Sequence, residues 1–280
     1  MKIFKLKEDL SNHLNILRSQ NSSIGFVPTM GALHDGHLSL IKASNQQCDK
    51  TVCSIFVNPT QFNNTADLEK YPRTIEHDIV ILENSGCDIL FIPEVDEIYP
   101  NNEQPVHYEL GFLETILEGE FRPGHFQGVC RVVDILLNII NPSFLFLGQK
   151  DYQQCMVLKK MITLRNHHTS IVTIPTMREA DGLAMSSRNM RLNTDQRIKA
   201  SKIYVALQKM NQSGSLPLLI AKKQALTLLS DAGFLVDYLE VANANTLEIL
   251  TEWEKTPMVI LVAAYLGDIR LIDNLILPGI

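Results

Sequence analysis

Two histidines lie three residues apart in a segment that can bind phosphate. The segment is Pro28-Thr29-Met30-Gly31-Ala32-Leu33-His34-Asp35-Gly36-His37, between a buried-strand pattern and a helical pattern. Gly31 allows the backbone to approach a ligand closely, and Gly36 removes bulk beside the second histidine. A helix start also offers free N–H groups and a positive dipole end to phosphate. If the helix begins near Leu33, both imidazoles share one face and can donate to a leaving pyrophosphate.

Other interpretations of an isolated His-x-x-His pair remain open. A solvated surface pair or a helix cap would show the same spacing. Zinc also binds such pairs, but no third ligand of suitable spacing lies nearby. The ten-residue context favours phosphate, and we assign no protein ligand to a metal ion.

A lysine and an aspartate follow another predicted strand, in the segment Gly148-Gln149-Lys150-Asp151. The Lys150 ammonium can neutralise phosphate charge, and Asp151 can orient it or bind the nucleotide. An ordinary solvated Lys–Asp pair is the alternative for these residue types alone.

A third candidate segment, Met185-Ser186-Ser187-Arg188, supplies two hydroxyl groups and a fork-shaped guanidinium suited to phosphate. A turn that caps the following helix is its alternative interpretation. Gln61 and Gln154 can each donate and accept hydrogen bonds, which suits a ligand with hydroxyl and carboxylate groups. An isolated glutamine, however, is more often a solvated surface residue.

These segments must be positioned by regular elements. Leucines at helical spacing predict a helix over 6–19, and further helices are expected to about Gln47 and near 75–82, 129–140 and 152–164. Strands are predicted at Ile24–Val27 (ended by Pro28), Thr51–Val57, Ile89–Ile92, Phe144–Leu147 and Ile171–Ile174. The alternation predicts an α/β fold: a Rossmann-like, mainly parallel sheet with helices on both faces. Ligands bind beyond the carboxyl ends of such strands, where segments 28–37, 58–63 and 148–154 follow.

The pattern changes near residue 175. Helices are predicted at about Asp195–Met210 and Leu218–Leu229, and two strands at Leu235–Val241 and Val259–Tyr265. We therefore expect a domain at 1–175 and a smaller C-terminal α+β domain at 176–280.

Composition narrows the class of protein. The 280 residues carry a net charge of −6, which disfavours nucleic acid as the main partner. The cysteines are scattered without a C-x-x-C motif, which disfavours a disulfide framework and favours reduced thiols in the cytosol. The N-terminus lacks the apolar core of a signal peptide, and no stretch reaches the ~18–20 apolar residues of a membrane helix. These features predict a soluble, cytoplasmic protein without membrane association.

The ten-residue block resembles the signature of pantothenate synthetases. Its His-x-Gly-His core also resembles the wider nucleotidyltransferase superfamily, which includes class I aminoacyl-tRNA synthetases. Further segments resemble the narrower family in order along nearly the whole chain: Ser54–Phe62, Tyr71–Thr74, Arg122–Val129, Phe146–Gln154, Arg178–Asn189 and Leu271–Asn274.

The resemblance implies an ATP-dependent ligase that joins pantoate to β-alanine through a pantoyl adenylate and releases AMP and pyrophosphate. It implies that the first domain binds ATP and pantoate while the smaller one closes over the site. The ATP contacts implied are Met30, Gly31, Ala32, Leu33, His34, Asp35, Gly36, His37, Gly148, Gln149, Lys150, Asp151, Met177, Met185, Ser186, Ser187 and Arg188.

Roles follow from the same resemblance. Gln61 would contact pantoate and β-alanine, and Gln154 pantoate. The catalytic set would be His34, His37, Lys150 and Ser186–Arg188, with His37 as proton donor. Mg²⁺ would accompany ATP, and the protein would be a homodimer through its larger domain.

Two departures from the family pattern stand out. Met177 replaces a smaller β-branched residue, and Ile135 stands where relatives often have lysine. The segment Arg122–Phe126 matches the family but receives no catalytic role here. A different nucleotidyltransferase and a non-catalytic nucleotide-binding protein remain alternatives, and AMP plus pyrophosphate as products would exclude both. A class I synthetase is disfavoured because the acidic chain shows no tRNA-binding extension.

Overall fold

The structure, a computed structural model, describes residues 1–100 and 106–278. The chain divides into two compact units. The first contains Met1–Gln149 and Gln154–Pro175, and the second contains Lys150–Gln153 and Thr176–Ile280. The short segment Lys150–Gln153 thus groups with the C-terminal residues.

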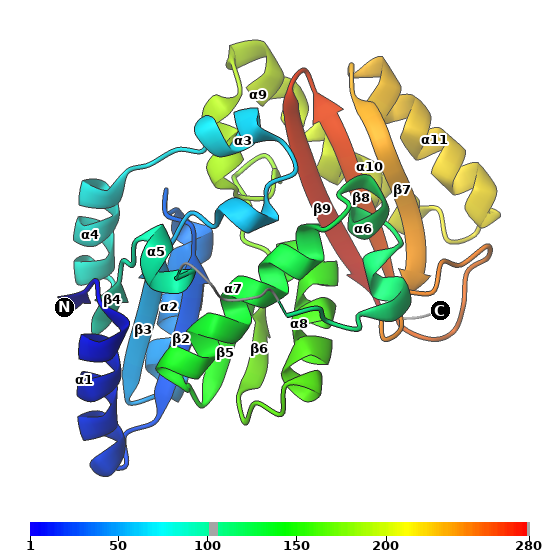
Figure 1. The fold of residues 1–280 in the computed structure, drawn as a ribbon. Helices are drawn as coiled ribbons and strands as arrows, with labels where there is room; N and C mark the ends of the chain where they lie inside the picture. Colours follow the sequence, from blue (N-terminus) through cyan, green and yellow to red (C-terminus); the bar gives the residue numbers. More distant parts are fainter. Residues whose placement is uncertain (101–105, 279–280) are drawn as a thin grey trace. The chain divides into compact units, whose positions relative to one another are not determined.

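A six-stranded parallel sheet is the central element of the first unit (Figure 1). Its strand order is β1 (Lys2–Phe4), β4 (Ile89–Phe91), β3 (Lys50–Ile55), β2 (Ile24–Thr29), β5 (Phe144–Gly148) and β6 (Ser170–Ile174). Each neighbouring pair is parallel. The predicted fold class is confirmed, although β1, a three-residue strand, was not predicted.

Helices cover both faces of this sheet. Successive residues of β2 and β3 are buried, and successive side chains point to opposite faces, so both faces are shielded from water. The helices α2 (Asp35–Gln47) and α4 (Ile75–Asn84) pack with Val27, Cys53 and Phe146 in one cluster. On the other face α7 (His125–Ile140) passes in front of the sheet in Figure 1 and contacts α1 (Lys7–Ser19).

Pro28 lies inside β2, whereas the sequence predicted that it ends the strand. The carbonyl of Thr29 accepts the N–H of Phe56 from the β3 side. Backbone groups alternate in direction along a strand, so the nitrogen of Pro28 faces β5, whose pairing with β2 ends at Phe26. The proline therefore breaks no ladder bond, and β2 continues to Thr29.

The other predicted elements of this unit are found with shifted ends. α7 begins at His125 rather than Val129, after Gly124 in the left-handed region at φ 78°. α8 spans Tyr152–Leu164 as predicted. Short helices that were not predicted are η1 (Pro59–Gln61), α3 (Thr65–Glu69), α5 (Val95–Ile98), η2 (Gly111–Glu114), α6 (Glu118–Phe121) and η3 (Gln149–Asp151).

The second unit contains an antiparallel sheet, β7 (Leu235–Asn243), β8 (Met258–Leu266) and β9 (Ile269–Leu277). The two predicted strands, Leu235–Val241 and Val259–Tyr265, are confirmed as β7 and β8, but β9 was not predicted. Leu266 pairs with Ile269, so Gly267 and Asp268 form a two-residue hairpin turn, and Gly267 has φ 64°. A Gly-Asp pair between apolar runs is a hairpin signal that the sequence did contain.

The helix predicted over Asp195–Met210 is in fact two helices, α9 (Thr194–Ala200) and α10 (Lys202–Gln212). Ser201 has ψ −17°, and its carbonyl accepts the N–H of Tyr204, three residues on, so the helix tightens there. The remaining elements of the unit are η4 (Ser187–Arg191) and α11 (Leu218–Asp231).

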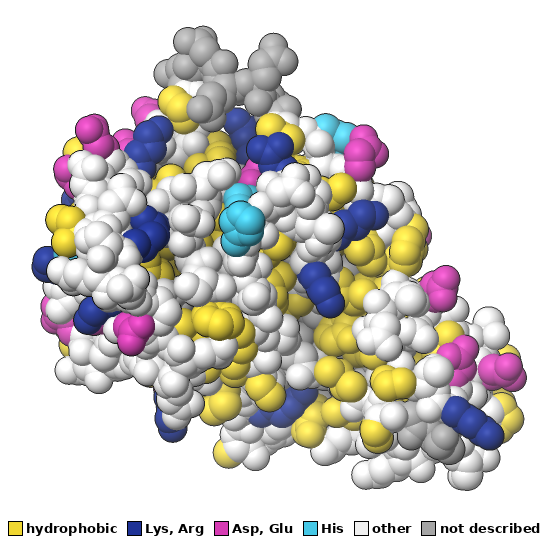
Figure 2. Space-filling view, turned by 90° about the horizontal axis from the view of Figure 1, so that it is seen from below, with side chains coloured by type: hydrophobic (Ala, Val, Ile, Leu, Met, Phe, Trp, Pro, Cys, Tyr) yellow, Lys and Arg dark blue, Asp and Glu magenta, His cyan; other side chains and the backbone are white. Residues whose placement is uncertain are grey.

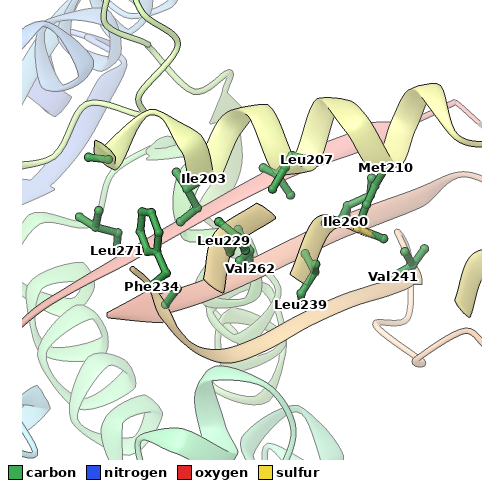
Figure 3. Close-up of a cluster of buried hydrophobic side chains, with 14 of the residues drawn as sticks. Ile203, Leu207, Met210, Leu229, Phe234, Leu239, Val241, Ile260, Val262 and Leu271 are labelled. Carbon is green, nitrogen blue, oxygen red and sulfur yellow. The ribbon is translucent and has the colours of Figure 1, made fainter. Parts of the chain in front are cut away.

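A hydrophobic core joins α10, α11 and the antiparallel sheet. In Figure 3, Ile203 and Leu207 of α10 point toward Val262 of β8 and Leu229 of α11. Met210 lies beside Ile260 in the same cluster. At about 25 cal/mol per Å² of buried apolar surface, this burial is the main stabilising contribution to the unit.

The surface carries both signs of charge. On the described part of the face in Figure 2, basic and acidic side chains are interspersed among apolar ones. No helix among the described residues is long and apolar enough to cross a membrane. The cysteines are free thiols, and burial raises the pKa of Cys53 and that of Cys87, the latter to about 12.

Candidate active site

His34 and His37 cap α2 with their own rings. His34 is the N-cap, and its Nδ1 accepts the N–H of Gly36 at 3.1 Å. The Nδ1 of His37 accepts the N–H of His34 at 3.3 Å. A ring nitrogen that accepts such a bond carries no proton, so each neutral imidazole keeps its proton on Nε2. Nε2–H is therefore the ring donor of each histidine.

The two rings form one compact pair. Their centroids are 4.1 Å apart, with the planes tilted by 42°. The helix begins at Asp35, so the expectation of a helix start near Leu33 was wrong by two residues. The histidines still face the same direction, because the cap and the third helical residue are held together by the capping box.

The segment before His34 is held by a buried aspartate that the sequence did not reveal. Asp78 of α4 is 1% exposed, and its carboxylate accepts the N–H groups of Ala32 and Leu33, each at 2.9 Å. Thr74 Oγ1 donates to the same carboxylate at 3.1 Å. Gly31 and Ala32 have φ 83° and 49°, the left-handed conformation that directs consecutive N–H groups toward one anion.

This arrangement changes how the segment can bind phosphate. The sequence predicted free backbone N–H groups at the helix start. In the structure Ala32 and Leu33 donate to Asp78, while His34 and Gly36 donate to imidazole nitrogens. At these four positions the predicted free backbone N–H groups are therefore not found, because each already has an acceptor within the protein.

Gln61 ends η1, and its side chain lies beside Met30. Its Nε2 is 3.2 Å from the sulfur of Met30, and its Oε1 accepts from Asn58 Nδ2 at 3.0 Å. Asn58 is 1% exposed and caps η1 by accepting the N–H of Thr60. The structure thus places Gln61 against Met30, in the segment that leads to His34, at the carboxyl edge of the parallel sheet.

The first turn of α7 supports Gln61. His125 Nδ1 donates to the carbonyl of Gln61 at 2.9 Å. A side chain at Gly128 would place its Cβ 2.2 Å from the carbonyl oxygen of Thr60, so only glycine fits there. The carbonyl of Gly128 accepts from Asn58 at 3.1 Å. The Arg122–Val129 motif, which received no catalytic role, therefore packs against the Gln61 segment.

Gly148 is the last residue of β5 and Gln149 follows it directly, also at the carboxyl edge of the sheet. Gln154 lies half-buried in the first turn of α8. These three residues belong to the first unit together with Met30–His37 and Gln61.

Lys150 and Asp151 belong with Lys150–Gln153 to the second unit. Lys150 Nζ is 3.3 Å from Asp151 Oδ2, and its side chain is 18% exposed against 44% for Asp151. The aspartate is therefore placed to orient the ammonium of a largely buried lysine side chain. Tyr152 Oη donates to the carbonyl of Ala244, which attaches this short segment to the C-terminal residues.

The remaining predicted ATP contacts lie in the folded-back segment Met177–Arg188 of the second unit. Met185 donates its N–H to the carbonyl of Met177 at 2.9 Å, while the side chain of Met177 is 42% exposed. Ser186 caps η4 by accepting the N–H of Arg188 at 3.3 Å. Ser187 is buried and Arg188 half-buried. The cap on the next long helix, α9, comes from Asn193 instead.

The donor inventory of the two units is suited to phosphate and carboxylate ligands. Imidazole, ammonium, guanidinium and hydroxyl groups can donate to anionic oxygens, and amides can bind hydroxyl and carboxylate groups. Among the described residues no group of three or more His, Cys, Asp and Glu side chains could hold a metal ion.

Known proteins resemble this chain over nearly its whole length. The profile of the family described as pantoate-beta-alanine ligase matches residues 2–276. A pantothenate synthetase of Bacteroides fragilis is 40% identical over 281 residues, covering 98% of each chain. A pantoate–beta-alanine ligase of Schizosaccharomyces pombe is 44% identical over 278 residues, covering 96% of this chain and 97% of its own.

Solved structures give the same result. The crystal structure of a pantothenate synthetase from Thermus thermophilus superimposes with a TM-score of 0.91 at 38% identity, covering 98% of this chain and 99% of its own. A pantoate-beta-alanine ligase from Francisella tularensis, complexed with beta-gamma ATP and beta-alanine, gives 0.83 at 38% identity, covering 98% and 97%.

Proposed function

The chain belongs to the pantoate–β-alanine ligase family, and we propose that it condenses pantoate with β-alanine, using ATP and releasing AMP and pyrophosphate. The observation that carries this proposal is the match over residues 2–276, joined to a site whose donors suit phosphate and carboxylate. The relative complexed with beta-gamma ATP and beta-alanine supports two of the three substrates.

The first proposed step activates pantoate. A carboxylate oxygen of pantoate attacks the α-phosphorus of ATP, the bond to the bridging oxygen breaks, and pyrophosphate leaves. Charge grows on the departing phosphates, where Nε2–H of His34 and His37, the Lys150 ammonium and the Ser186–Arg188 segment donate. His37 contributes a hydrogen bond from its Nε2–H to the leaving phosphate and gives up no proton, because a neutral imidazole is not an acid near neutral pH.

The second proposed step forms the amide bond. The neutral amine of β-alanine attacks the acyl carbon of pantoyl adenylate, AMP leaves, and the nitrogen loses a proton. Gln61 holds pantoate and β-alanine, and Gln154 holds pantoate, so the amine approaches a carbonyl already fixed in position. Met30–His37, Gly148–Asp151, Met177 and Met185–Arg188 bind ATP, and the smaller domain closes over the site.

Further parts of the proposal concern the setting of the reaction. Mg²⁺ enters with ATP, because the ion prefers phosphate oxygens and retained waters to an all-protein cage. The protein acts in the cytoplasm as a homodimer formed through its larger domain.

The reaction is tested by incubating the purified protein with Mg-ATP and pantoate, with and without β-alanine. We expect sustained AMP and pyrophosphate formation only with both acids, and pantothenate equal in amount to AMP. Pyrophosphate without amine-dependent turnover would indicate another acceptor. Formation of neither AMP nor pyrophosphate would indicate a protein that binds nucleotide without turning it over.

A further inference from the structure

Two adjacent residues of β9, Asp273 and Asn274, are buried at the end of the Leu271–Asn274 motif. They are 2% and 1% exposed, and neither has a role in the reaction described above. Polar groups with so little exposure require hydrogen-bond partners, and those partners reveal what the pair holds.

Asp273 binds the guanidinium of Arg178 through both oxygens. Arg178 Nη1 is 2.6 Å from Oδ2, and Nη2 is 3.0 Å from Oδ1. The same guanidinium donates to the carbonyl of Gly182 at 3.0 Å and lies 3.8 Å from the ring centroid of Tyr204. Hydrogen bonds hold the edges of the Arg178 guanidinium, and the Tyr204 ring contacts one of its faces. The group therefore cannot shift without losing several contacts.

Arg178 is the second residue of the folded-back segment Met177–Arg188, which ends with Ser186–Arg188. It forms an antiparallel bridge with Ala184, and Glu179 donates its N–H to the carbonyl of Leu183 at 2.8 Å. The bond from Met185 to Met177 closes the segment immediately before Ser186. Because Asp273 anchors Arg178, it also fixes the position of the segment from which the Ser186–Arg188 donors extend.

Asn274 holds the short segment that carries Lys150. Its Nδ2 donates to the carbonyl of Lys150 at 2.9 Å, and its own N–H donates to Asp273 Oδ1 at 2.8 Å. Burial raises the pKa of Asp273, and the hydrogen bonds and charge of Arg178 oppose that rise. One strand thus connects the backbone of Lys150 with the segment that carries Ser186–Arg188.

We propose that Asp273 and Asn274 are positioning residues that set the Lys150 ammonium and the Ser186–Arg188 donors relative to each other for the phosphates of ATP. The inference rests on the proposed function, because it takes those donors as the ones that bind the polyphosphate. Several donors act on one polyphosphate only when their spacing is fixed in advance, and a misplacement of about 1 Å can cost about 100-fold in rate.

A merely structural role predicts a different outcome, and the same sheet offers a matched control. Arg270 Nε is 2.7 Å from Asp237 Oδ2, and both side chains are largely buried. This ion pair joins β9 to β7 instead of the phosphate-binding segments. Asp237→Asn therefore weakens a buried ion pair of the sheet without releasing Arg178 or Lys150.

The test compares Asp273→Asn, Asn274→Ala and Asp237→Asn in the full-length protein. Calorimetry measures Mg-ATP binding, steady-state assays give kcat and the KM for each substrate, and thermal unfolding gives stability. For Asp273→Asn and Asn274→Ala we expect ATP binding to weaken by about 10-fold or more and kcat to fall by up to about 100-fold, with the KM for pantoate within about twofold. Asp237→Asn should change none of these by more than about twofold.

Asn274→Ala removes no charge and decides the question if Asp273→Asn fails to fold. Unchanged ATP binding and turnover in Asn274→Ala would overturn the inference. So would equal losses in Asp237→Asn, or a parallel rise in the KM of all three substrates. Failure of the proposed function shows separately, as wild-type protein that binds Mg-ATP but makes no AMP from pantoate and β-alanine.

Discussion

At the scale of single residues, His34 and His37 are constrained by the backbone that they cap. Each Nδ1 accepts an N–H, which leaves the ring proton on Nε2 and makes both rings neutral donors. The same side chains therefore combine a structural task at one ring nitrogen with a proposed chemical task at the other. Substitutions that preserve only one of these nitrogens can separate the two tasks.

His37→Asn and His37→Gln form such a pair. The amide of asparagine reaches the place of Nδ1 and can accept the N–H of His34, whereas that of glutamine reaches the place of Nε2. We expect Asn to keep stability within about 1 kcal/mol and to lose turnover by about 10²–10⁴-fold. Glutamine should unfold more easily yet retain more activity. Steady-state kinetics and urea unfolding measure both, and equal turnover in the two variants would remove Nε2 from the mechanism.

Asp78 gives a second prediction at this scale. Asp78→Asn keeps the shape of the side chain but offers only one oxygen to the N–H groups of Ala32 and Leu33. Leaving such a group unsatisfied costs about 1–3 kcal/mol, and the displaced segment carries His34. We expect kcat to fall by about 10²-fold, measured together with the unfolding midpoint.

Asp134 supplies the control for Asp78. It is also buried, and it accepts Tyr108 Oη and Arg165 Nε at 2.9 Å each. Asp134→Asn should lower the unfolding midpoint while leaving kcat within about twofold. If both variants lose stability and neither loses turnover, Asp78 holds only the fold.

At the scale of elements, α7 positions η1 through close backbone contact. The carbonyl of Thr60 lies where a Cβ of residue 128 would be, and His125 holds the carbonyl of Gln61. The first turn of α7, which was not predicted, thus supports Gln61, which was predicted as a site residue. The contact leaves no room for even a methyl group, so the spacing between helix and segment is testable by one substitution.

Gly128→Ala should push η1 away from α7. We expect a loss of about 1–3 kcal/mol from overpacking and a KM for pantoate and β-alanine raised by about 10-fold, since a small displacement of Gln61 weakens its contacts. The KM for ATP should stay within about twofold. Gly86→Ala is the control, because its φ of 79° makes alanine costly at a site in the helix–strand connection after α4. Equal kinetic effects of the two variants would contradict the proposed role of η1.

The sequence predicted elements well where local pattern decides them and poorly where contacts decide them. α4 was found from its helical spacing and β3 from its β-branched residues, and the motifs indicated which segments follow the strands. β1 is too short to show a pattern, and Pro28 stays in β2 only because β5 stops pairing beside it. Asp78 could not be found, because its partners Ala32 and Leu33 lie more than forty residues away along the chain.

At the scale of the whole molecule, the chain is two units that divide the proposed ATP contacts between them. His34 and His37 belong to the unit that contains the parallel sheet, and Lys150 and Ser186–Arg188 belong to the C-terminal unit. The net charge of −6 shows that the cationic donors are local features of an acidic protein. An acidic group also makes the stability of the fold depend on pH.

Asp181 makes one such contribution. The hydrogen bond from Arg197 is the main cause that lowers the pKa of Asp181 below 3.8. Because its folded pKa is depressed, its contribution to stability is present above 3.8 and is lost as the pH falls through the folded value. Asp181→Asn should therefore be less stable than wild type at pH 7, and its stability should fall less steeply as the pH is lowered. Unfolding midpoints from neutral to acidic pH measure this, and parallel curves would contradict it.

The central claim is that a pantoate carboxylate oxygen attacks the α-phosphorus, and labelled oxygen tests it most directly. Pantoate carrying ¹⁸O in its carboxylate is incubated with the protein, Mg-ATP and β-alanine, and the AMP is analysed by mass spectrometry. Aminolysis breaks the acyl carbon–oxygen bond, so the account predicts that each AMP retains a labelled oxygen. Unlabelled AMP, or ADP formed together with labelled inorganic phosphate, would contradict it.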